Sequence, residues 1–115
     1  GNSGLQFRAQ KVGEFVLHGY QADAGQVYWG SLYEEGGRGM LAQVPTEVWQ
    51  PVLNEQGWNH YVVEAAGDLL RIELNGQATV ELHDGAAASG HLGFQLHAGG
   101  RTVVRIRNVR LRPLG

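Results

Sequence analysis

The clearest local pattern in the chain is Leu70-Arg71-Ile72-Glu73-Leu74, followed by Asn75-Gly76 and then by Gln77-Ala78-Thr79-Val80-Glu81-Leu82. Apolar and polar residues alternate on both sides of Asn-Gly, and this period is typical of strands that bury one face. Asn-Gly tolerates positive φ at both central positions of a type I′ turn. The stretch therefore predicts an antiparallel β-hairpin.

The same period of two extends along most of the chain. It predicts short strands in residues 5–8, 15–18, 60–64, 92–97 and 103–107. The last two are separated by Ala98-Gly99-Gly100 and should form a second hairpin. After Ile106 the apolar residues resume at an odd offset, which predicts a bulge or bend near Arg107-Asn108. Many short strands with little helix indicate an all-β fold, an antiparallel β-sandwich or barrel.

Length and composition limit the architecture. The chain has 115 residues, 18 Gly, three Pro, no Cys and a formal net charge of −2. This length fits one domain over residues 1–115. The lack of Cys excludes disulfides, thiolate metal sites and cysteine nucleophiles. No apolar run is long enough to span a bilayer, and the first residues do not resemble a signal peptide, so no membrane partner is expected.

The alternation also predicts a polar sheet face. If Leu92, Phe94 and Leu96 point into the core, Gln95 and His97 point to the opposite face. By the same logic Gln6 and Arg8 lie opposite Leu5 and Phe7, and Gln21 and Asp23 share one side of their strand. Such side chains suit sugar hydroxyls, and Tyr33, Trp49 and Trp58 are candidates for an aromatic wall against sugar C–H faces. The alternative is that these side chains bind no ligand and belong to a sheet face that is exposed to solvent.

Other functional classes have little support in the sequence. There is no phosphate-binding loop and no nucleophile elbow. The five His residues are scattered, so spacing shows no metal site. Five of the nine cations lie between Arg101 and Arg112, but the isoelectric point is about 6.2 and no stacking aromatics accompany them. We therefore expect no nucleic-acid partner.

Several strings, taken in order, resemble the landmarks of the 3-keto-disaccharide hydrolase domain family. They are Asn2-Ser3-Gly4-Leu5-Gln6-Phe7-Arg8, Gly19-Tyr20-Gln21-Ala22-Asp23, Gly30-Ser31-Leu32-Tyr33-Glu34, Gly57-Trp58-Asn59-His60-Tyr61, Leu74-Asn75-Gly76, Gly90-His91-Leu92-Gly93-Phe94-Gln95-Leu96-His97 and Arg107-Asn108-Val109-Arg110-Leu111. The resemblance implies a concanavalin-like jelly roll. It also implies an exported, extracytoplasmic bacterial protein that acts on glycosides oxidised at the sugar 3-position.

The resemblance assigns roles to five residues on the expected polar face. His97 is implied as base or metal ligand, and Asp23 as acid/base or metal ligand. Arg8 would stabilise developing oxyanion charge, while Gln21 and Gln95 would orient the substrate through hydrogen bonds. The sequence shows no evident cofactor. The roles implied for His97 and Asp23 would allow a divalent metal ion.

Two alternatives to the enzyme remain open: a non-catalytic carbohydrate-binding module and a structural, self-assembling β-sandwich, because a jelly roll hosts all three. The family domain normally begins before the Asn-Ser-Gly strand, so the sandwich is expected to be truncated at its N-terminus. A strand edge left bare in this way invites pairing with another copy. The expected partners are a saccharide or keto-saccharide and a second copy in a homo-oligomer.

Overall fold

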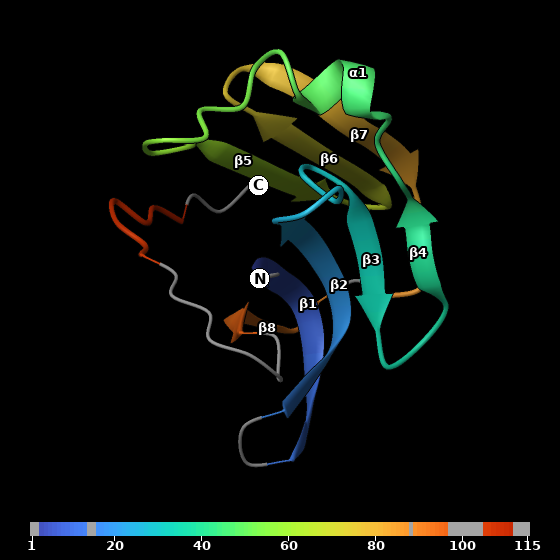
Figure 1. Cartoon of the computed structure of the whole chain (residues 1–115). Helices are drawn as coiled ribbons and strands as arrows, with labels where there is room; N and C mark the ends of the chain where they lie inside the picture. The colour runs from blue at the N-terminus through green and yellow to red at the C-terminus, as the bar shows by residue number, and fades with distance from the viewer. Residues whose placement is uncertain (1–2, 14–15, 88, 97–104, 112–115) are drawn as a thin grey trace.

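Two antiparallel sheets form the molecule (Figure 1). The computed structural model describes residues 3–13, 16–87, 89–96 and 105–111, with the backbone alone at 95 and 96. Sheet A has the order β4-β3-β2-β1-β8 and sheet B the order β5-β6-β7. The strands are β1 (Ser3–Gly13), β2 (Val16–Ala24), β3 (Leu32–Glu35), β4 (Gly39–Ala42), β5 (Tyr61–Ala66), β6 (Leu69–Leu74), β7 (Gln77–His83) and β8 (His91–Leu96). The all-β sandwich prediction is confirmed.

The predicted hairpin is present as β6 and β7. Its two turn residues, Asn75 and Gly76, have φ of 50° and 85°, which is the combination that a type I′ turn requires. The Asn75 side chain also ties three segments together. Its Nδ2 donates to the Val52 carbonyl at 2.7 Å and to Asn59 Oδ1 at 2.9 Å, and its Oδ1 accepts from the His60 N–H at 2.8 Å. The turn therefore anchors the loop that precedes β5.

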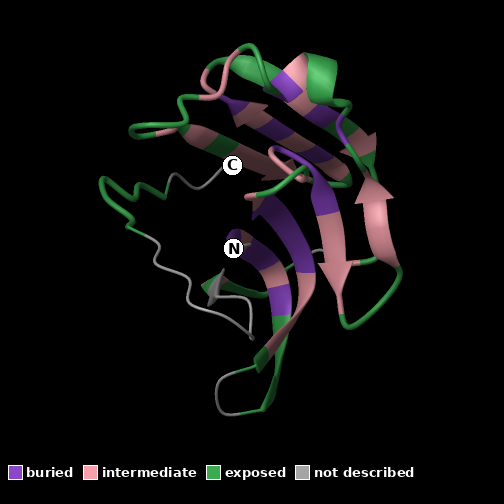
Figure 2. Cartoon of the chain, in the orientation of Figure 1, coloured by how far each residue is buried: buried purple, intermediate pink, exposed green. Residues whose placement is uncertain are grey.

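The core lies where the two sheets face each other (Figure 2). Sheet A contributes Phe7, Tyr20, Ala22 and Leu32, and sheet B contributes Leu70, Ile72, Leu74 and Val80. The Phe7 and Tyr20 rings stack with centroids 5.5 Å apart. The short helix α1 (Thr46–Trp49) adds Trp49 to this cluster, and in the described part of the chain it is the one α-helix. That helix is too short to span a membrane.

Polar contacts also join the sheets. Tyr20 is on β2, and its Oη donates to Oδ1 of Asp84 at 2.5 Å. Asp84 directly follows β7. Asp84 in turn accepts from both terminal nitrogens of Arg38, whose guanidinium also pairs with Glu34. On the other side Thr79 Oγ1 donates to the Gly30 carbonyl at 2.7 Å. These bonds hold β2 and its flanking loops against β7.

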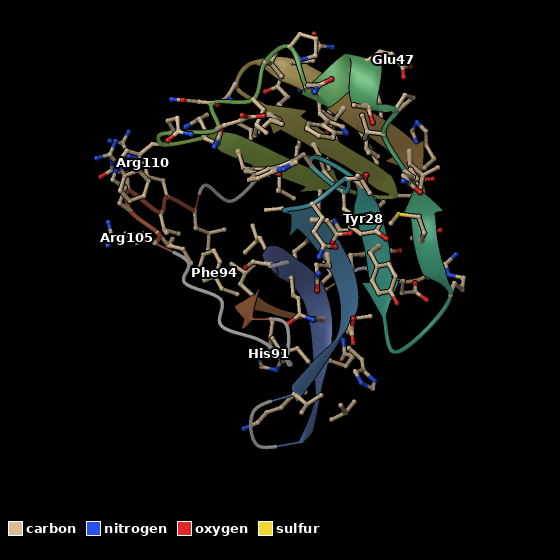
Figure 3. All side chains as sticks on the ribbon, viewed as in Figure 1. Tyr28, Glu47, His91, Phe94, Arg105 and Arg110 are labelled. Atoms are coloured by element: carbon tan, nitrogen blue, oxygen red, sulfur yellow. The ribbon has the colours of Figure 1, made fainter. Side chains whose placement is uncertain are left out.

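Two sequence predictions near the C-terminus are wrong. Residues 105–111 form no strand, so the described part of the expected second hairpin consists of β8 alone. The predicted bend is confirmed, because Asn108 has a φ of 55°. Leu92 and Phe94 are 53% and 50% exposed and do not enter the core. Phe94, labelled in Figure 3, pairs with Leu5 on the core-facing side of β8, and among the described strands β8 is the last of sheet A.

Candidate functional site

The cross-strand register places several polar residues on the face of sheet A that points away from sheet B. Residues directly opposite each other in an antiparallel pair share one face. Gln95, Gly4 and Asp23 form one row across β8, β1 and β2. The next row contains Gly93, Gln6, Gln21 and Tyr33. The core-facing Tyr20 and Ala22 alternate with Gln21 and Asp23 along β2.

Asp23 and Gln21 form the centre of this face. Gln21 Nε2 donates to Asp23 Oδ1 at 2.7 Å, and both residues are 2% exposed. Burial raises the pKa of Asp23 to about 6, because a buried carboxylate loses its hydration. The hydrogen bond from Gln21 lowers the pKa and the negative charge of Glu35 raises it, but neither outweighs burial. Asp23 can therefore take up and release a proton near neutral pH.

Three more polar residues share the face. Gln6 is buried, and its Nε2 donates to the Leu17 carbonyl at 3.1 Å. Tyr33 and Glu35 are half-buried on β3, opposite Gln21 and Gly19. The sequence predictions assigned no role to Glu35. The pairing of β3 with β2 places it on the same face as Gln21 and Asp23.

Arg8 does not lie on this face, and this correction follows from a β-bulge. Residues 8 and 9 of β1 stand opposite Gly19 alone, and Arg8 has a φ of 46°. A bulge inserts one extra residue and shifts the alternation that follows it. The Arg8 guanidinium donates instead to the carbonyls of Gly67 at 2.6 Å and Ala87 at 3.2 Å, in loops that flank sheet B. Arg8 thus braces the two sheets.

Two of the predicted residues are described only in part or not at all. Gln95 has the predicted register position, opposite Gly4 and in the row of Asp23. His97 lies outside the described residues, so its role as base or ligand stays a prediction.

The three candidates for an aromatic wall occupy different places. Trp49 is 7% exposed and packs in the core, where no sugar can stack on it, so that assignment is corrected. Trp58 is 46% exposed, and the guanidinium of Arg107 lies 4.0 Å from its ring centroid. Tyr33 alone shares the face of Gln21 and Asp23.

Among the residues with described placement, no group of three or more His, Asp or Glu side chains could hold a metal ion. Asp23 Oδ1 already accepts the Gln21 amide, and Glu35, which shares this face, stands opposite Gly19 on β2. The described face therefore does not fit a metal centre. It fits proton transfer by a single carboxyl group that an amide orients.

Comparison with known proteins identifies a family for the chain. A family model described as 3-keto-alpha-glucoside-1,2-lyase-like domain matches residues 1–112. No curated protein matches the chain.

Proposed function

The chain belongs to the 3-keto-alpha-glucoside-1,2-lyase-like domain family, and from this membership we propose that it cleaves glycosidic bonds of sugars oxidised at the 3-position. The observation that carries the proposal is the buried Asp23 with a pKa of about 6, held by Gln21 on the face opposite the core. A group with this pKa is suited to both accept and return a proton at neutral pH.

The chemistry needs such a group. A 3-keto group acidifies the proton on the neighbouring C2 carbon, so a base can remove it. The electron pair left on C2 forms a double bond to C1, the C1–O bond breaks, and the departing oxygen takes a proton. Water then adds across the double bond. We assign Asp23 as the acid/base and Gln21 as the residue that orients it, with Tyr33 as the aromatic contact for the sugar.

The burial of Asp23 supports a second candidate function. Because its side chain is 2% exposed, a sugar can reach the carboxyl only if neighbouring side chains move aside. Tyr33 and Glu35 are more accessible on the same face. A non-catalytic module that binds saccharides through these residues is therefore the alternative.

One experiment separates the two. Wild type and Asp23→Asn are incubated with a 3-keto-disaccharide, with and without an added divalent cation, and product sugars are quantified. The cation arm is included because His97, a predicted ligand, lies outside the described residues. The enzyme proposal expects turnover by wild type and at least a hundredfold loss in the variant, the scale of general acid–base catalysis. Calorimetric binding of the disaccharide with no turnover in either arm would favour the binding module.

We further propose that the chain forms a homo-oligomer through β8. Among the strands that the structure describes, β8 is at the edge of sheet A, and its Leu92 and Phe94 leave apolar surface half exposed. An exposed edge strand with apolar side chains favours pairing with a second copy.

A further inference from the structure

The Gln21 side chain packs directly over the backbone of Gly4 on β1. Gly4 stands opposite Asp23, while Gln21 stands opposite Gln6, so Gly4 and Gln21 are diagonal neighbours on the same face. A Cβ atom built on Gly4 would lie 2.7 Å from Gln21 Cγ and 2.9 Å from Gln21 Nε2. Real Cβ atoms do not approach other heavy atoms this closely. The Gln21 side chain thus fills the space that any larger residue at position 4 would occupy.

The Gln21 side chain occupies this space in the conformation in which its amide reaches Asp23. The Gln21 amide must lie close along the sheet to bring Nε2 within 2.7 Å of Asp23 Oδ1, two residues further along the same strand. Both side chains are buried, so this bond is shielded from competition with water. The backbone of Gly4 has no φ in the left-handed region, so conformational freedom does not explain a glycine there.

We propose that Gly4 is a positioning residue, whose missing side chain leaves the room in which the Gln21 amide reaches Asp23. The proposal deepens the proposed function, on which it rests for its effect on turnover. The packing and the hydrogen bond stand independently of any reaction.

A matched control lies on the neighbouring strand. Gly93 is on β8, on the same face, opposite Gln6. A Cβ atom there would meet Leu17 Cδ1 at 2.6 Å, the end of a flexible side chain, and its next neighbours lie 3.9 Å away. By contrast, the Cβ at position 4 would also lie 2.7 Å from the Ala22 carbonyl oxygen, which is backbone. An alanine at 93 should therefore be accommodated by rotation of Leu17.

The test follows the side-chain amide of Gln21 by NMR in wild type, Gly4→Ala and Gly93→Ala. In wild type its Hε protons should exchange slowly with water. Gly4→Ala should speed this exchange by about tenfold or more, the scale of one lost hydrogen bond, and Gly93→Ala should leave it unchanged. A folded Gly4→Ala variant that keeps the slow exchange would overturn the proposal.

The double variant Gly4→Ala/Gln21→Ala covers the case in which Gly4→Ala does not fold. Truncating Gln21 removes two of the three atoms that the new Cβ would meet below 3.0 Å, so the double variant should be more stable than Gly4→Ala and the two changes should be non-additive. If both the single and the double variant fail to fold, the contact with the Ala22 carbonyl alone is responsible and the proposal is wrong. An inactive wild type with the expected exchange pattern would refute the proposed function and leave the role of Gly4 intact.

Discussion

Replacing Asp23 with Asn should stabilise the protein at alkaline pH while removing its proposed activity. The pKa of Asp23 is raised from 3.8 to about 6 in the folded state, so the folded chain binds this proton more tightly than the unfolded chain. The stability that the protonated carboxyl contributes is fully present below 3.8 and is lost as the pH rises through about 6. Asn keeps an Oδ1 that can accept the Gln21 amide, but it carries no charge to bury.

The magnitude follows from the difference in pKa. A difference of about 2 corresponds to ~3 kcal/mol, because one pKa unit equals about 1.36 kcal/mol. Compared with wild type, the free energy of unfolding of Asp23→Asn should therefore gain ~3 kcal/mol between about pH 4 and about pH 8. Taking the difference between variant and wild type cancels the titration of groups that do not interact with Asp23, including Asp84, whose pKa is lowered.

The assay is urea denaturation of both proteins across this pH range. Glu35→Gln provides a graded comparison, because it removes a charge that raises the pKa of Asp23 and should shift the wild-type profile the same way by a smaller amount. Parallel pH profiles for wild type and Asp23→Asn would refute the reasoning, since they would mean that Asp23 binds its proton equally well in both states.

Three further outcomes are expected. Asp84→Asn should lower the melting temperature by roughly 4–8 °C at neutral pH in calorimetry, and the loss should shrink below pH 3.8 because Arg38 lowers the pKa of the folded carboxyl. Asn75→Ala should cost about 1–2 kcal/mol more than Asn75→Gly in urea denaturation, because only Gly keeps the positive φ without strain; equal losses would contradict this. Phe94→Glu should convert a wild-type dimer to a monomer in sedimentation; a monomeric wild type would end that proposal.

Alternation and turn chemistry predicted the parts of the fold that depend on local sequence. The Asn75-Gly76 hairpin is present because both turn residues tolerate positive φ, and Gln21 and Asp23 share a face because β2 is regular there. Arg8 was misplaced because a bulge depends on how β1 pairs with two neighbours, which its own sequence does not reveal.

The burial of a residue was harder to predict than the side of the strand on which it lies. Phe94 lies on the expected side of β8, yet it is half exposed, because burial depends on what covers the strand. Trp49 was expected near the sugar, but the short helix that carries it packs against the core. Gly4 received no role in the sequence predictions, because its importance lies in a diagonal contact with another strand.

The pairing of β1 with β8 has a kinetic consequence. Sheet B consists of three consecutive strands within residues 61–83, so it can form from local hairpins. Sheet A joins Ser3 to Leu96, and closing so long a loop costs more chain entropy and slows folding. On a ribosome, β1 must wait until residues 91–96 have been synthesised before β8 can join it. The row that contains Gln95, Gly4 and Asp23 should therefore assemble later than sheet B.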